Sequence, residues 1–154
     1  GPQRPRGRSR AVAPTGILLR LVLDNPSLAA RLPADLIEPA DAESLALIAI
    51  IDAMSIGDIE ADCGVAALVE RFRETPHGTA LSKVAGELVD TEFDESVVEL
   101  LFEDTLRKLQ ADSIDHEIVE LTRRERDSGL TSAERHHLAH LILQKRQLGE
   151  PRKS

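Results

Sequence analysis

The sequence has 154 residues, three phenylalanines, no tyrosine, no tryptophan and a net charge of −8. This length allows one domain, or one domain with a small appendage, whose core must be built from Leu, Ile, Val and Ala. The single cysteine, Cys63, excludes an intramolecular disulfide and a cysteine-cluster zinc site, and we expect it to be a small core residue. No apolar run approaches the roughly 20 residues that a membrane-spanning helix requires.

Charge is distributed unevenly along the chain. Residues 1–13 carry +4, residues 14–105 carry −14 and residues 106–154 carry +2. Because an acidic body repels phosphate, contact with nucleic acid would rest on the two ends of the chain, where aromatic stacking platforms are missing. A nucleic-acid-binding regulatory helical domain is therefore kept as an alternative function.

The two ends of the chain are expected to lack regular structure. Residues 1–13 mix Pro, Gly and Arg without apolar periodicity, which is typical of a flexible linker. Composition alone leaves open whether this linker follows another domain or is the tail of a complete protein. Residues 150–154 are expected to form a short disordered tail, because Gly149 and Pro151 end the preceding helix.

Residues 14–110 predict an all-α bundle of about five to six helices, since helix formers dominate and no alternating strand pattern appears. The first helix should end at Asn25, which we expect to cap a short helix at about 26–32. Further helices are predicted at 42–55 with Asp41 as cap, at about 62–74 and at 79–89. Their expected core residues are Leu45, Ile48 and Ile51, with Leu47 as a further candidate, then Val65, Leu68, Val69 and Phe72, and then Leu81, Val84 and Leu88.

A long helix is predicted next, because residues 94–128 contain neither Gly nor Pro. It is either one helix or two nearly continuous ones, since the apolar stripe shifts at residues 111–113. The first half is expected to pack on the bundle through Val97, Val98, Leu101, Phe102, Leu106 and Leu109. The second half, where Ile114, Ile118 and Leu121 resume the stripe at a different angle, is expected to leave it.

The stretch RERDSGLTSAER, residues 124–135, predicts a tight turn between two helices. Gly129 can adopt the left-handed conformation just past a helix end, and Leu130 can make the apolar contact that accompanies this cap. Thr131 and Glu134 have the spacing of a reciprocal capping box. Residues 111–149 are therefore expected to form a helical hairpin.

The interior of this hairpin is expected to be small. An antiparallel arrangement sets Leu121 against Leu138 and Ile118 against Leu141. Val119, Ala139, Ile142, Leu143 and Leu148 remain outside this seam. Burial of one such side chain contributes roughly 1.5–3 kcal/mol, whereas ordering one residue costs about 1–2 kcal/mol. Either the hairpin folds back on the bundle, or a partner protein covers its apolar surface.

No catalytic motif is recognised in the sequence. His136 and His140 have the four-residue spacing that can bind metal on a helix, but their expected neighbours on the facing helix are Val119 and Arg123, so no metal site is predicted. The carboxylates Asp112, Asp115, Glu117 and Glu120 are expected to lie on a solvated helix face.

Two stretches carry a family resemblance. LLRLVLDNPSLAARLP near the start and FEDTLRKLQADSIDHEIVELTRRERDSGLTSAERHHLAHLILQKRQLG near the end resemble the C-terminal helicase-binding domain of bacterial DNA primase. The similarity covers about residues 14–149, and its most specific parts are residues 23–26 and 124–135. It implies a helical bundle bearing a hairpin that docks on the N-terminal domains of the hexameric replicative helicase, with the bundle helping to stimulate the helicase.

The resemblance also implies what this chain would lack. The zinc-binding and polymerase domains of a primase would make RNA primers elsewhere in the protein, so zinc and magnesium are expected there and no cofactor here. Residues 1–13 would be the tether from the polymerase domain. DNA would be reached only through the parent protein, at the replication fork in the cytoplasm, with no membrane contact. The exposed hairpin surface would also allow self-association.

The resemblance further implies where the helicase contact lies, on the last helix and the facing part of the long one. The expected contact residues are Ile118, Val119, Thr122, Arg123, His140, Leu143, Gln144, Arg146, Gln147 and Leu148. The chain departs from the family pattern at its end, where GEPRKS replaces a helix that runs to a Lys-rich terminus.

Overall fold

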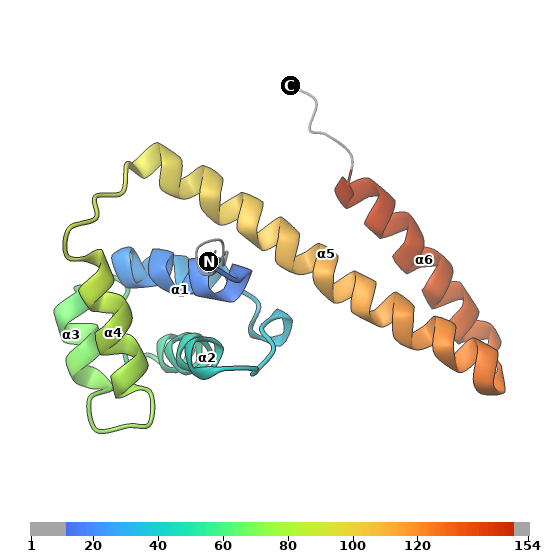
Figure 1. Cartoon of the computed structure of the whole chain (residues 1–154), viewed down its shortest axis with the longest axis horizontal. Coiled ribbons are helices and arrows are strands. Elements are labelled where there is room, and N and C mark those ends of the chain that lie inside the picture. The colour runs from blue at the N-terminus through green and yellow to red at the C-terminus, as the bar shows by residue number, and fades with distance from the viewer. Residues whose placement is uncertain (1–11, 150–154) are drawn as a thin grey trace, which may run out of the picture. The chain divides into compact units, whose positions relative to one another are not determined.

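The computed structural model describes residues 12–149, and within this range every regular element is a helix. The all-α fold class predicted from the sequence is confirmed. The chain divides between Leu106 and Arg107 into two compact units, which we describe separately (Figure 1). The predicted tail at 150–154 and most of the predicted linker at 1–13 lie outside the described residues.

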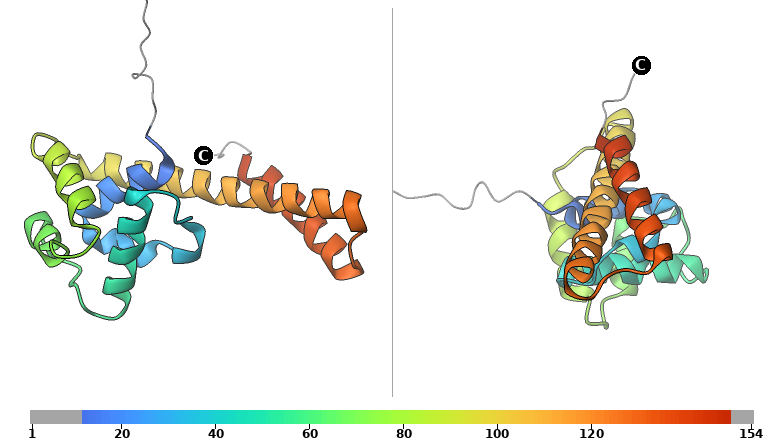
Figure 2. Two further views of the ribbon diagram at one scale, coloured as in Figure 1. Left: turned by 60° about the horizontal axis from the view of Figure 1, so that its bottom comes forward. Right: turned by 90° about the vertical axis from the view of Figure 1, so that its right-hand side faces the viewer.

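The first unit is a helical bundle. Its elements are α1 (Pro14–Asp24), the 3₁₀ helices η1 (Pro26–Arg31) and η2 (Ala34–Leu36), α2 (Ala42–Ser55), α3 (Val65–Arg71), α4 (Gly78–Leu88) and the first part of α5 (Glu95–Ser128). Helix α1 packs mainly on α2, and α3 lies beside α4 (Figure 2).

Helix α1 supplies much of the core of this unit. Its sequence is apolar around most of its circumference, which is typical of a helix covered on several sides, and Leu18, Leu19 and Val22 are completely buried. Asn25 occupies the N-cap position of the next helix, with Pro26 at its first position, as predicted, but its side chain makes no capping bond. Its amide oxygen accepts instead from the Ser27 hydroxyl at 2.7 Å.

Helix α2 begins and ends as its sequence specifies. The Asp41 carboxylate accepts from the Ser44 backbone N–H at 2.9 Å, and the Ser44 hydroxyl accepts from the Asp41 N–H at 2.9 Å, so the predicted cap is confirmed. The expected core position of Leu45 is wrong, because Leu45 is 44% exposed while Leu47 and Ile50 are fully buried. Apolar residues surround this helix, so periodicity alone did not fix which face is turned inward.

Helices α3 and α4 form the remaining wall of the bundle. Helix α3 is shorter than the predicted 62–74, since Gly64 precedes it and the chain turns at Phe72. Leu68, Leu81 and Val84 are fully buried as expected, whereas Val65 is exposed.

Cys63 was predicted to be a core residue, and this is wrong. It lies in the loop before α3 with intermediate exposure, and its thiol donates to the Gly64 carbonyl at 3.4 Å. Partial burial and the nearby carboxylates raise the pKa of the thiol.

The first turns of α5 complete the bundle. Val98 and Phe102 are buried as predicted, but Val97 is 52% exposed because it lies on the adjacent side of the helix. The guanidinium of Arg31 stacks 4.6 Å from the centre of the Phe102 ring. The same guanidinium bonds to Glu99, so η1 and α5 are joined by both stacking and charge.

The second unit is a helical hairpin. The remainder of α5 and α6 (Ser132–Gly149) run antiparallel and lie side by side in every view (Figures 1 and 2). Helix α5 continues through residues 111–113, so the sequence alternative of one long helix is the one observed.

Candidate functional site

The interior of the hairpin is a compact cluster of aliphatic side chains. Leu121, Leu130 and Leu141 are buried, and the partly buried residues packed against them are Ile114, Ile118 and Leu138. The seam predicted from the sequence is therefore confirmed. Leu130 extends it into the turn, and Ile114 extends it toward the open end.

The turn between α5 and α6 is held by backbone and side-chain caps. Gly129 has φ of 81°, and its N–H is shared between the carbonyls of Arg124 at 3.0 Å and Glu125 at 3.2 Å. The Thr131 N–H donates to Glu134 Oε1 at 2.9 Å, and the Glu134 N–H donates to Thr131 Oγ1 at 3.1 Å. Both predicted caps are confirmed.

Glu134 also binds across the turn. Its carboxylate pairs with Arg124 on α5. The Thr131 N–H and then the Arg124 guanidinium stabilise the charged form, which lowers the pKa of this carboxyl. The cap of α6 is thus also an ion pair between the two helices.

Further ion pairs fix the register of the hairpin. Lys145 Nζ lies 2.6 Å from Asp115 Oδ1, and Arg135 Nε lies 3.9 Å from Glu125 Oε1. Opposite-charge pairs at such positions favour one alignment of the helices over its neighbours. Arg123, Arg124, Arg135 and Lys145 are thus engaged within the hairpin, which disfavours a free basic surface for nucleic acid.

His137 forms one more contact between the helices, with its Nε2 atom 3.1 Å from Glu117 Oε2. The sequence interpretation considered His136 and His140 but gave no role to this histidine. A helical register is needed to place His137 opposite Glu117, so no local motif could have identified the pair.

The predicted contact residues occupy different environments. Leu143 is 50% exposed and Val119 is 61% exposed, as a docking surface requires. Ile118 is partly buried in the hairpin interior, and Leu148 is also partly buried. The remaining predicted residues are exposed: Thr122, Arg123, His140, Gln144, Arg146 and Gln147. Their role in binding stays a prediction.

Ile142 was not among the predicted contact residues, although it is 45% exposed. Apolar side chains exposed to this extent are candidates for a protein interface when they lie close together. The sequence placed Ile142 outside the seam but gave no reason to prefer it to its neighbour Leu143.

The hairpin carboxylates lie on a solvated surface, as predicted. Asp115, Glu117 and Glu120 all form ion pairs, the last with Arg123. Within residues 12–149, no three or more potential ligands among His, Cys, Asp and Glu are grouped so as to hold a metal ion. In the same range, no helix combines the length and apolar character needed to cross a membrane.

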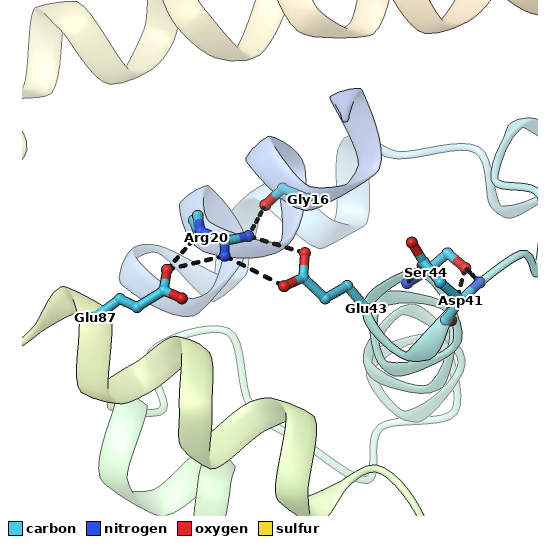
Figure 3. A network of polar contacts seen from close by, with 6 residues as sticks. All are labelled: Gly16, Arg20, Asp41, Glu43, Ser44 and Glu87. Atoms are coloured by element: carbon cyan, nitrogen blue, oxygen red, sulfur yellow. Dashed lines mark hydrogen bonds and ion pairs between the residues drawn. The ribbon is translucent and has the colours of Figure 1, made fainter. Parts of the chain in front are cut away.

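In the first unit, the most connected polar group is Arg20 (Figure 3). Its guanidinium donates to Glu43 Oε1 at 3.0 Å, to Glu87 Oε1 at 2.9 Å and to the Gly16 carbonyl at 2.9 Å. These bonds join α1 to α2 and α4, and the two carboxylates raise the pKa of Arg20. A shallow groove beside this network is lined by Val12, Thr79 and Lys83 among others. The hydrogen bonds of the guanidinium are thus made to other residues of the bundle.

Comparison with known proteins identifies the family. A model of the family described as "DNA primase DnaG DnaB-binding" matches residues 16–141. A DNA primase of Pasteurella multocida (strain Pm70) is 33% identical over 139 residues, which are 87% of this chain and 22% of that primase.

A solved structure shares the fold. The C-terminal domain of DnaG primase from Vibrio cholerae aligns with a TM-score of 0.64 at 24% sequence identity, covering 89% of this chain and 97% of that structure. This likeness supports the fold. The family match over residues 16–141 leads to one conclusion: the chain belongs to the family of DnaB-binding domains of the DNA primase DnaG.

Proposed function

We propose that this chain docks a DNA primase on the N-terminal domains of the hexameric replicative helicase, and that the hairpin makes the contact. The observation that carries this proposal is the exposed aliphatic surface of the hairpin, formed by Val119, Ile142 and Leu143, in a member of the DnaB-binding family. When a partner removes such side chains from water, the free energy falls and the complex is stabilised.

The function is recruitment rather than catalysis. This chain corresponds to 22% of the length of the related primase, and primer synthesis, with its zinc and magnesium, belongs to the other domains of such a protein. Residues 1–13 serve as the tether. Holding the polymerase domain by a tether raises its effective concentration at the DNA without any new catalytic contact.

The first unit helps to stimulate the helicase once the hairpin has docked. The site of action is the replication fork in the bacterial cytoplasm, and DNA is reached only through the rest of the primase. The acidic surface of residues 14–105, with a charge of −14, fits a domain that does not itself bind phosphate.

A binding experiment tests the proposal. The chain is titrated into the N-terminal domain of its cognate helicase and the heat of binding is measured. We expect saturable binding with a dissociation constant in the micromolar range or below, about −8 kcal/mol or better. Absence of binding at concentrations near about 100 μM would contradict the proposal.

A matched pair of variants locates the contact. Leu143→Asp on the hairpin should weaken binding at least about tenfold, because a carboxylate replaces a side chain that the partner buries. Leu45→Asp is the control, since Leu45 is similarly exposed, at 44% against 50%, but lies on the bundle. Equal loss of affinity in both variants would place the contact outside the hairpin. A parallel titration with single-stranded DNA, at low and high salt, tests the nucleic-acid alternative.

A further inference from the structure

The two broad faces of the hairpin differ in chemistry. Spacings of three and four residues bring side chains to one stripe of a helix. One face, which we call the apolar face, consists of Val119 and Thr122 from α5 and of Arg135, Ala139, Ile142 and Arg146 from α6. The opposite face, which we call the polar face, consists of Glu117, Glu120 and Arg124 from α5 and of His137, His140 and Gln144 from α6.

Ion pairs between the helices show which stripes share a face. Glu117 bonds to His137, so these two stripes lie together on the polar face. On the other side, Asp115 bonds to Lys145. Asp115 lies one helical turn before Val119, and Lys145 lies one turn after Ile142, so the aliphatic residues of the two helices lie on the same face of the hairpin.

Covering each face with a partner would change the free energy of binding differently. Val119 and Ile142 are exposed by 61% and 45%, so covering them removes apolar surface from water. The polar face already pairs its charges, through Glu117 with His137 and Arg124 with Glu134. Covering these ion pairs would cost desolvation with no apolar burial to offset it. The apolar face also borders ion pairs, Arg135 with Glu125 and Asp115 with Lys145, but burial of Val119 and Ile142 offsets that cost.

We propose that the apolar face alone docks on the helicase, and that it meets an apolar helical surface of the helicase N-terminal domain with carboxylates at its edge. The carboxylates follow from charge complementarity, since Arg146 is exposed at one end of the α6 stripe, and Arg135 at the other end is exposed and lies 3.9 Å from Glu125. Leu143 lies at the outer edge of α6, one turn from Ala139 and from Arg146. It adds apolar area to the same docking surface. This inference rests on the proposed function.

A consequence is that seven of the ten contact residues predicted from the sequence divide into two groups. Val119, Thr122, Leu143 and Arg146 belong to the docking surface. His140, Gln144 and Gln147 belong to the polar side of α6 and remain in water in the complex. Ile142, which the sequence interpretation omitted, lies at the centre of the contact.

The experiment compares two double variants that each add two carboxylates to exposed positions of the hairpin. Val119→Asp with Ile142→Asp alters the apolar face, and His140→Asp with Gln144→Asp alters the polar face. Binding to the helicase N-terminal domain is measured for both and for the wild type. We expect a loss of at least about 30-fold for the apolar-face variant and less than about threefold for the polar-face variant.

Several outcomes would overturn the inference. These are an equal or larger loss in the polar-face variant, or unchanged binding in both variants while the wild type binds. The proposed function would survive either result, whereas failure of the wild type to bind would overturn both. Helical content and thermal unfolding are recorded for each variant. If the apolar-face variant unfolds, Val119→Thr with Ile142→Thr replaces it, and binding equal to that of the wild type then counts against the inference.

The alternative occupant of the apolar face is a second copy of this chain. Sedimentation of the free protein over a range of concentrations distinguishes the two. A dimer that the apolar-face substitutions abolish, with helicase binding unchanged, would assign this face to self-association and overturn the inference.

Discussion

Thr131 and Glu134 cap each other: the N–H of Thr131 donates to Glu134 Oε1 at 2.9 Å and the N–H of Glu134 donates to Thr131 Oγ1 at 3.1 Å. This reciprocal pair begins α6 immediately after the left-handed Gly129 ends α5. The chain therefore reverses within three residues, and the two helices have little freedom to shift along one another.

Thr131→Ala should destabilise the hairpin by about 1 kcal/mol, because the Glu134 N–H at the start of α6 loses its acceptor. The measurement is hydrogen exchange of the α6 amides, which reports local opening. Ser132→Ala is the control, since Ser132 is exposed and adjacent, and it should change the opening free energy by less than about 0.5 kcal/mol. Equal effects of the two substitutions would show that the capping bond contributes nothing.

The stability of the turn should also depend on pH. The Thr131 N–H and Arg124 lower the pKa of Glu134 in the folded protein below its ordinary value of 4.5. The contribution of a carboxyl with a lowered pKa is fully present above the unfolded pKa and is lost as pH falls through the folded pKa.

We therefore expect the α6 amides to lose protection as the pH falls from about 5 into the acid range. Glu134→Gln should show a smaller dependence on pH over that window, with lower protection already at neutral pH. A pH profile identical in wild type and variant would assign the acid sensitivity of the hairpin to other carboxylates.

Leu141→Ala should cost about 2–5 kcal/mol, since Leu141 is 3% exposed at the centre of a small interior. Because few other side chains hold α5 to α6, we expect α6 and the end of α5 to become rapidly exchanging while the bundle stays protected. The matched control is Ile142→Ala at the next residue, which is 45% exposed and should cost about 1 kcal/mol or less. Simultaneous loss of protection in the bundle would mean that the two units unfold together.

Arg20→Leu should destabilise the first unit by about 1–3 kcal/mol, because it leaves Glu43 and Glu87 near one another without their shared cation. Arg73→Leu provides the comparison, since its pair with Glu70 is more than 60% exposed on both sides and should contribute little to stability. Urea unfolding followed by circular dichroism measures both. If Arg20→Leu lowers the free energy of unfolding no more than Arg73→Leu does, the ion pairs of Arg20 with Glu43 and Glu87 contribute no more to stability than an exposed ion pair.

The sequence predicted the hairpin better than the bundle, and the reason is the range of the interactions. Caps such as Gly129 and Thr131 with Glu134 depend on residues within one turn, so they can be recognised directly. The seam between Leu121 and Leu141 then follows from the turn by counting residues outward. The resemblance supplied the function, which periodicity alone would not have given.

The bundle depends on contacts that no local pattern reveals. Arg20 is the one polar residue among residues 17–23, and its partners Glu43 and Glu87 lie 23 and 67 residues away. The inward face of α2 was wrongly assigned at Leu45, because a helix rich in Ala, Leu and Ile has apolar residues on every side. Packing against α1 decides such a case, and packing is absent from a single sequence.

The hairpin interior and its outer faces occupy separate helical stripes, and this has an evolutionary consequence. Substitutions at Val119 or Ile142 leave the interior formed by Leu121, Leu130 and Leu141 untouched. If the proposed docking surface is correct, it can therefore change together with the partner of each bacterial species while the scaffold stays the same. Primases and helicases from distant species should then be mismatched at the surface of the hairpin even where their folds superpose.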